Sequence, residues 1–330
     1  MKKFFALLGA LCLLLTGCSS ISTGNGIVSG TDFAFDTTVS IQLYGDYDPS
    51  IVEGAIDLCK SYEQIFSRTD PDSELYRLNA GEITEVSPEL SALIQEGLYY
   101  AALSGGAFDI TTGALSDLWQ FGSDEPHVPS AEAIATALAG VGYEKVSVEG
   151  SHVTLPEGTR IDLGAIAKGY IADRIRDYLA EQGVASAIIN LGGNLYCLGS
   201  RPDGTAFRVG IQYPYKERDE VIAAVEVSDL SVVTSGVYER YFEEDGVLYH
   251  HILNTDTGYP ADTGLLAVSI LSPSSTQADA LSTTCFALGL EEGMALVDSI
   301  EDAYAIFITE DLTLHYSEGL QEAYPVEARS

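Results

Sequence analysis

Apolar residues recur every three to four positions in five segments of the chain, and this spacing places them on one face of an α-helix. The first helix is expected from Pro49, with apolar side chains spaced through Ile65. A second is expected after Ser87, a residue type that caps helix N-termini, and before Gly105-Gly106, which would close it. The pattern predicts three further helices, over residues 130–140, 166–182 and 276–288.

The second half of the chain also contains runs of apolar and β-branched residues that predict strands. These runs cover residues 185–191, 206–212, 222–227, 247–253, 265–271 and 303–309. Short connections, such as the turn Glu244-Asp245-Gly246, favour antiparallel pairing of neighbouring strands. Helices gathered beside such strands predict an α+β fold, with mostly antiparallel sheets packed with helices.

The first residues have the pattern of a signal peptide rather than of a membrane span. An apolar run from Phe4 to Leu15 follows two lysines, and it is shorter than the ~20 residues that cross a bilayer. Leu15-Thr16-Gly17-Cys18 resembles the bacterial lipobox, which is cleaved before a cysteine that becomes lipidated. An ordinary secretory signal with a chance cysteine is the alternative.

These features predict the division of the chain and its location. We expect a signal peptide at residues 1–17, a lipidated flexible tether at 18–30 and a folded domain at 31–330. The domain would be anchored through Cys18 to the extracytoplasmic face of a bacterial cell membrane.

The charge balance excludes some classes of partner. The chain has 49 acidic and 16 basic residues, a formal net charge of −33, which would repel the phosphates of nucleic acid. The same charge opposes docking on anionic lipid without an anchor. Cys59, Cys197 and Cys285 would remain in the folded part at wide spacing, so no disulfide framework or zinc pattern is expected and they are predicted to be buried.

One short segment, residues 161–170 (IDLGAIAKGY), combines an acid, a slim turn and a lysine at the opening of a predicted helix. Glycine and alanine at 164 and 165 would let a ligand approach the backbone closely. A helix N-terminus offers free N–H groups to an anion. Asp162 and Lys168 are therefore predicted to lie near a phosphate-bearing ligand.

The predicted helix over residues 276–288 carries a possible cation site. Asp279 and Thr283 are four residues apart and would share one helix face, with Ser282 beside them. A carboxylate with hydroxyl and backbone oxygens suits a hard cation such as Mg²⁺. The alternative is that Asp279 only caps this helix.

Two other segments hold candidate site residues. Asp109 lies between Phe108 and Ile110, where an acid needs a partner or a ligand, although an ordinary turn aspartate is as plausible. His250 and His251 are adjacent, so on a strand they would point to opposite faces and at most one would face a site. A lone strand histidine is more often structural than catalytic.

Eight segments, taken in order, resemble those of the FAD:protein FMN transferases, also known as ApbE-type flavin transferases. They begin at Phe35 (FDTTVSIQLYG), Ser67 (SRTDPDSELYRLN), Gly105 (GGAFDITTGAL), Ile161 (IDLGAIAKGYIAD), Asn190 (NLGGNLYCLG), Thr234 (TSGVYERYFEEDG), His250 (HHILNTDTGYP) and Ala278 (ADALSTTCFALG). The resemblance spans about residues 31–290 and implies a single catalytic unit of the flavin transferase type.

The resemblance also implies roles for individual residues. Those expected to contact FAD are Phe35, Ala107, Phe108, Asp109, Asp162, Lys168 and Leu253. Mg²⁺ would be held by Asp279 and Thr283 with backbone oxygens of Ala165 and Ser282, and His251 would act near the chemistry as a base. Two segments depart from the pattern, since Asn254-Thr255 stands where Asp-Pro is common and Phe35-Asp36-Thr37 where some members have Met-Gly-Thr.

The implied reaction is Mg²⁺-dependent transfer of the FMN moiety of FAD to a Ser or Thr hydroxyl of an acceptor protein, with release of AMP. The acceptor would be a subunit of a membrane redox complex or an FMN-binding domain. One alternative is hydrolysis of FAD to FMN and AMP at the same site. Another is a flavin- or solute-binding lipoprotein without catalysis, which would have no need of the predicted cation site.

Overall fold

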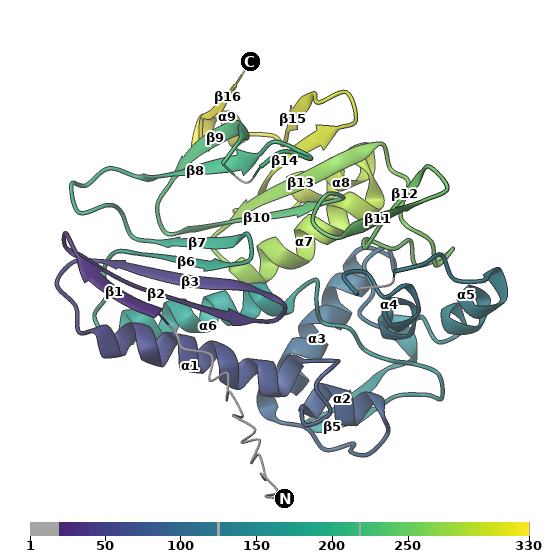
Figure 1. The fold of residues 1–330 in the computed structure, drawn as a ribbon. Helices are drawn as coiled ribbons and strands as arrows, with labels where there is room; N and C mark the ends of the chain where they lie inside the picture. The colour runs from purple at the N-terminus through teal and green to yellow at the C-terminus, as the bar shows by residue number, and fades with distance from the viewer. Residues whose placement is uncertain (1–19, 124–125, 218, 330) are drawn as a thin grey trace, which may run out of the picture.

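The computed structural model describes residues 20–123, 126–217 and 219–329. The predicted signal peptide and Cys18 lie outside the described residues. Within the described part, the central element is a nine-stranded sheet in which every neighbouring pair of strands is antiparallel (Figure 1). Its order is β1 (Ser20–Gly24), β2 (Ile27–Ala34), β3 (Thr37–Tyr44), β6 (Ala187–Leu191), β7 (Asn194–Leu198), β10 (Leu230–Gly236), β13 (Leu265–Ser272), β14 (Tyr304–Thr309) and β15 (Leu314–Tyr316).

Three helices pack against one face of this sheet (Figure 1): α1 (Pro49–Phe66), α6 (Ala167–Glu181) and α7 (Ser275–Leu288). The apolar stripe of α1 explains its place, because Val52, Ala55 and Ile56 recur at helical spacing and are almost fully buried. The same core takes in alternate residues of the strands, such as Val39 and Ile41 of β3.

A second, three-stranded sheet covers the other face of the main sheet. Its order is β16 (Val326–Ala328), β9 (Val221–Val227) and β8 (Phe207–Gln212). Phe207 and Ile211 of this sheet share a core with Val232 of β10, whose neighbour Val233 belongs to the core on the helix side. The strands of the main sheet between these layers are therefore apolar on both faces.

The remaining elements flank the sheet and the three helices. They are α2 (Glu74–Asn79), α3 (Pro88–Leu103), α4 (Gly113–Trp119), α5 (Ala131–Leu138), a 3-10 turn (Tyr143–Lys145), β4 (Ser147–Glu149), β5 (His152–Thr154), the hairpin β11 (Tyr241–Glu244) and β12 (Val247–His250), α8 (Leu290–Asp298) and α9 (Leu320–Ala323). Trp119 anchors a small core between α4, α5 and the hairpin, and its indole N–H donates to the Gly258 carbonyl.

The predicted α+β class with antiparallel sheets is confirmed, and the five predicted helices are all present. Ser87 caps α3 through a bond from the Leu90 N–H, and Cys59, Cys197 and Cys285 are buried free thiols as expected. The prediction of a flexible tether is wrong for residues 20–30, which form β1 and the first part of β2. Residue-by-residue antiparallel pairing of Ser20–Gly24 with Ile27–Thr31 satisfies their backbone and holds them on the sheet.

Candidate active site

A cavity of about 610 Å³ lies where the N-terminus of α6, the face of α7 that carries Asp279 and Thr283, the β2–β3 turn and the segment after β12 meet. This volume is ordinary for a small-molecule site. Nearly all the residues predicted to form the site line the cavity: Phe35, Ala107, Phe108, Asp109, Asp162, Ala165, Lys168, His251, Leu253, Asp279 and Thr283. The fold therefore gathers them from segments far apart in the sequence.

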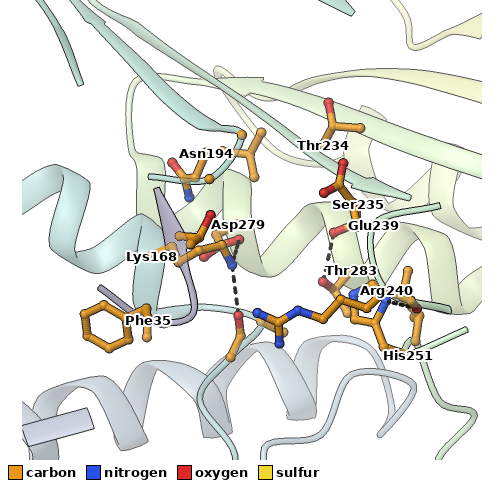
Figure 2. A pocket seen from close by; sticks show the side chains of 18 of the residues that line it. Phe35, Lys168, Asn194, Thr234, Ser235, Glu239, Arg240, His251, Asp279 and Thr283 are labelled. Carbon is orange, nitrogen blue, oxygen red and sulfur yellow. Dashed lines mark hydrogen bonds and ion pairs between the residues drawn. The ribbon is translucent and has the colours of Figure 1, made fainter. Parts of the chain in front are cut away.

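Asp279 joins α7 to the start of α6. Its carboxylate accepts a 2.8 Å hydrogen bond from the Gly169 N–H. The Lys168 ammonium lies 3.6 Å from its other oxygen, and Figure 2 shows these two side chains together. The Asp279 side chain is only 4% exposed. Asp279 is the fifth residue of its own helix, which Ser274 caps instead, so the alternative of a simple cap on α7 is wrong. The negative group that binds an N–H group at the N-terminus of α6 is therefore the Asp279 carboxylate.

Asp279 and Thr283 line the cavity from successive turns of α7, as their spacing predicts. The Ser235 hydroxyl of β10 lies 3.1 Å from the Thr283 hydroxyl and 2.7 Å from that of Ser282. A role for the backbone oxygen of Ser282 stays a prediction, but its side chain is fully buried and is not part of the cavity wall. The reason is its helical position, about 100° round from Thr283, which turns it into the contact between α7 and β10.

The donor set fits a hard cation better than a soft one. In the part of the chain that the structure describes, no three His, Cys, Asp or Glu side chains cluster as metal ligands. From α7 the cavity instead receives one carboxylate, Asp279, and one hydroxyl, Thr283, and Ala165 also lies on its wall. Such oxygen donors suit Mg²⁺, which usually keeps several waters and takes other ligands from substrate phosphates.

Asp162 is held by a cation that the sequence analysis did not assign. The Arg68 guanidinium lies 3.1 Å from its carboxylate and also pairs with Asp117, and the Gly164 N–H donates to Asp162 at 2.8 Å. Burial by itself raises the pKa of Asp162, but Arg68 and the hydrogen bonds outweigh this and hold the pKa below its usual value. Asp162 is thus a carboxylate that shapes the turn before α6.

Asp109 combines the two roles that the sequence left open. It lines the cavity, yet its oxygens accept bonds from the backbone and hydroxyl of Thr111 and from the Tyr143 N–H. The bond from the Thr111 N–H is that of a turn aspartate. Burial raises the pKa of the Asp109 carboxyl although these bonds act in the opposite direction. Contact between Asp109 and FAD stays a prediction.

The two adjacent histidines are separated as predicted, although β12 ends at His250 rather than at residue 253. The chain leaves the strand there because residues 252–253 pair with 260–261 instead. His250 is buried, its Nε2 donates to the Ala261 carbonyl and its Nδ1 accepts from the Ile252 N–H, so both ring nitrogens are used within the fold. His251 lines the cavity.

The His251 ring has one nitrogen free for chemistry. Its Nδ1 lies 3.2 Å from the Arg240 carbonyl (Figure 2), and because a carbonyl only accepts, Nδ1 carries the proton and Nε2 keeps its lone pair. Burial, with a smaller contribution from the positive charge of Arg240, lowers the pKa of His251 to about 3. The ring is therefore neutral at physiological pH.

The two departures from the family pattern are accommodated, one by a turn conformation and the other by local hydrogen bonds. Phe35 and Asp36 form the β2–β3 turn with φ of 52° and 56°, and aspartate tolerates this left-handed conformation better than most residues. Asn254 accepts bonds from the N–H groups of residues 256 and 257, and the Thr255 hydroxyl donates to the Gly106 carbonyl. Both segments keep their place on the cavity wall.

Arg68, Arg240 and Asn194 line the cavity but were not among the candidates from the sequence. Arg68 and Arg240 each lie in a segment that carries the resemblance, and a search of those segments for cations could have found them. Asn194 follows the Gly192-Gly193 turn in another of these segments. Only the structure shows that its side chain reaches the cavity.

We expect Gly169→Ala to destabilise the protein, although such a change in a helix usually stabilises it by about 1 kcal/mol. An added Cβ at 169 would lie 2.2 Å from the Ser275 carbonyl oxygen and 2.7 Å from the Asp279 Cβ. Overpacking of this kind costs about 1–3 kcal/mol. Urea denaturation measures the change, and an unchanged or raised midpoint would show that the α6–α7 contact is looser than described.

Comparisons with known proteins agree with one another. A family model described as the ApbE family matches residues 35–308. Among the most similar relatives is a FAD:protein FMN transferase from Treponema pallidum (strain Nichols), 36% identical over 95% of this chain and 93% of its own. Another FAD:protein FMN transferase, from Klebsiella pneumoniae (strain 342), is 36% identical over 87% and 90% of the two chains.

Solved structures show the same likeness. The ApbE protein from Thermotoga maritima has a TM-score of 0.82 at 34% identity and covers 90% of this chain and 98% of its own. Flavin transferase ApbE from Vibrio cholerae has a TM-score of 0.81 at 28% identity, with the same coverage. The similarity thus extends over nearly the whole described fold.

Proposed function

Since the chain belongs to the ApbE family of FAD:protein FMN transferases, we propose that it transfers FMN from FAD to a Ser or Thr hydroxyl of an acceptor protein, with Mg²⁺, and releases AMP. The chain is an enzyme, a flavin transferase, and FAD is its substrate. The hydroxyl group of the acceptor, the metal ion and the AMP product are the details that we propose in addition.

The observation that carries this proposal is the arrangement on α7. Asp279 and Thr283 line one cavity together with Lys168 and with the free Nε2 side of the His251 ring. Oxygen donors for a cation, an ammonium group and a neutral base are the groups that phosphoryl transfer requires. A site for flavin binding alone would not need the base or the cation donors.

The cation would be held by Asp279, Thr283 and the backbone oxygen of Ala165. Mg²⁺, when bound there, would supply charge stabilisation on the transferring phosphoryl group and on departing AMP. Lys168 already lies beside Asp279, and its ammonium adds positive charge on the side of the cavity where the substrate phosphates would bind.

His251 would take the proton of the attacking hydroxyl at Nε2. The hydroxyl oxygen forms a bond to the FMN-side phosphorus of FAD, and the bond from that phosphorus to the bridging oxygen breaks. The electron pair of the broken bond leaves with AMP. The Arg240 carbonyl keeps the His251 proton on Nδ1, which orients the basic nitrogen away from the backbone.

Hydrolysis of FAD with water as the acceptor is the second candidate, because the same site could serve it. The test is to incubate the full chain with FAD, Mg²⁺ and a candidate acceptor domain, and to weigh the acceptor. We expect its mass to rise by that of FMN less one water. The rise should disappear when EDTA is added or when the acceptor hydroxyl residue is replaced by alanine. An unchanged acceptor mass with free FMN in solution would favour hydrolysis.

We also propose that the enzyme is lipid-anchored at Cys18 on the extracytoplasmic face of the membrane, where flavin-bearing redox subunits would be its acceptors. Among the described residues, no helix is long and apolar enough to span a bilayer. Cys18→Ala should remove the lipid, because the sulfur of the lipobox cysteine is the atom to which the lipid is attached. Metabolic labelling with a fatty acid measures this, with Cys12→Ala as a matched control that should keep the label. An unlabelled wild-type protein would contradict the anchor.

A further inference from the structure

Asn194 has an unused hydrogen-bond donor on the wall of the cavity. The residue is the first of β7, it is 1% exposed, and it belongs to the cavity lining. Its Nδ2 is buried without a hydrogen-bond partner. A buried amide donor left unpaired costs free energy, so such a group on a ligand cavity indicates a partner supplied by the ligand.

The Asn194 amide is held in one orientation by a buried network. The Ser275 hydroxyl donates to Asn194 Oδ1 at 2.7 Å, and the Ser231 hydroxyl lies 2.9 Å from that of Ser275. The Ser275 backbone is fixed in turn, because its N–H donates to the Asp173 carboxylate at 2.9 Å. With Oδ1 engaged in this way, the buried NH₂ group is left on the side of the amide that faces Lys168 and Asp279.

The NH₂ group faces the part of the cavity proposed to bind phosphates. Ser275 and Asp279 lie one turn apart on the same face of α7, and both contact the position of Gly169 on α6. In Figure 2 the amide nitrogen of Asn194 points toward Lys168 and Asp279. The neighbouring Gly193 leaves this wall open, since no atom lies within 4 Å of where its Cβ would be.

The balance of charges on the cavity wall favours an uncharged hydrogen-bond donor for binding an anionic substrate there. The permanent cations of the wall are Arg68, Lys168 and Arg240, against the carboxylates of Asp36, Glu63, Asp109, Asp162, Glu239 and Asp279. Arg68 is paired with Asp117 and Asp162, and Lys168 donates to the Gly164 carbonyl at 3.0 Å. The oxygens of an anionic substrate therefore need further donors, and an uncharged amide supplies one without a counter-charge.

We infer that Asn194 Nδ2 donates a hydrogen bond to a pyrophosphate oxygen of FAD, which makes Asn194 a substrate-binding residue of the transferase. The inference rests on the proposed function in that it takes the pyrophosphate to lie beside Asp279. Ser275 is then a positioning residue, because its hydroxyl aims the amide. The bond holds the diphosphate against α7 while the cation and His251 act on it.

Asn194→Asp tests the donor directly. Aspartate keeps the shape of asparagine and an oxygen for the Ser275 hydroxyl, but it replaces the donor with a charged acceptor that repels phosphate. We expect the affinities for FAD and for ADP to fall by about 10-fold to 100-fold or more, as for the loss of one hydrogen bond to a charged group. Both affinities are measured calorimetrically, with Mg²⁺ and without an acceptor. ADP serves as a probe because it carries the diphosphate without the flavin.

The matched control is Asn190→Asp, which adds the same charge to the same turn. Asn190 also lines the cavity, but its Oδ1 accepts from the Gly193 N–H at 2.9 Å, a role that aspartate can keep. Its effect on ADP affinity should be several-fold smaller. Equal losses in the two variants, or unchanged ADP affinity in Asn194→Asp at a native melting temperature, would overturn the inference. Because binding is measured without an acceptor, a wild type that binds ADP but transfers no FMN would contradict the proposed function alone.

Discussion

Asp279→Asn is expected to lower the rate of FMN transfer by at least about 10²–10³-fold at ordinary Mg²⁺ concentrations, the cost of removing one preorganised electrostatic group from a transition state. Asp279 is the carboxylate of the proposed cation site, and it lies beside Lys168 on the cavity wall. Asparagine keeps the oxygen that accepts from the Gly169 N–H but removes the negative charge that attracts the cation.

Asparagine is a better test than alanine here because of how Asp279 is buried. A carboxylate on the surface of a helix could be removed at little cost in stability. In the structure the Gly169 N–H depends on Asp279, so alanine would leave a buried donor unpaired and cost about 1–3 kcal/mol of stability. Alanine would thus lower activity partly through folding.

The measurement is single-turnover transfer at several Mg²⁺ concentrations. Higher Mg²⁺ should restore part of the rate in Asp279→Asn if the lost charge mainly weakens cation binding. Glu292→Gln, an exposed carboxylate on α8, is the matched control and should keep the wild-type rate. Full turnover by Asp279→Asn at ordinary Mg²⁺ would remove this residue from the metal site.

His251→Asn is expected to slow transfer about 10²–10⁴-fold, the usual contribution of a general base. The affinity for FAD should change little, because a base acts mainly in the transition state. Asparagine can still place a donor near the Arg240 carbonyl, so the change removes the basic Nε2 more than the local packing. Stopped-flow transfer at saturating FAD and acceptor measures the rate.

The pH dependence gives a second test of His251. Its pKa is lowered to about 3 in the free enzyme, so the neutral base is present throughout the neutral range. The ascending limb of kcat/KM, which reports the free enzyme, should therefore lie well below the ordinary imidazole pKa. Anionic phosphates favour the imidazolium, so the limb of kcat, which reports the complex, should lie at higher pH. His251→Asn should lose both limbs.

The choice of control for His251 also follows from the structure. His250 would be the obvious neighbour to mutate, yet its two ring nitrogens bridge Ala261 and Ile252 and its replacement would disturb the segment after β12. His152, which pairs with Glu85 outside the cavity, is the better control. A His251→Asn enzyme as fast as His152→Asn would move the base to another group.

Local sequence signals predict much of the fold because they act within one element. Helices α1 and α3 have a proline in their first turn after a capping residue, and their apolar residues recur at helical spacing. Strands β2 and β3 were not predicted, although Val39 and Ile41 alternate with polar residues in β3. Residues 20–30 have the composition of a linker, yet they pair with each other and with β3, the next strand along the chain, and this pairing places them in the sheet.

The parts of the site that lie within short sequence motifs could be predicted from the sequence. Asp279 and Thr283 share a helix face by spacing alone, and the resemblance supplied the segments that surround them. Spacing does not say which side of α7 faces β10, so it could not show that the Ser282 side chain lies in that contact. Asn194 could not be assigned because its role depends on Ser275, a residue 81 positions away that fixes the amide. The number of cations left to bind a substrate in the cavity depends likewise on ion pairs between distant residues, such as Arg68 and Asp162.

The central claim is that FAD is split at its pyrophosphate with an acceptor protein, and not water, as the nucleophile. The most direct measurement is a single-turnover reaction of the full chain with FAD, Mg²⁺ and an excess of acceptor domain, in which AMP, free FMN and acceptor-bound flavin are quantified together. One AMP for each flavin attached to the acceptor, with no free FMN, is the predicted result. AMP matched by free FMN, with an unmodified acceptor, would contradict the account.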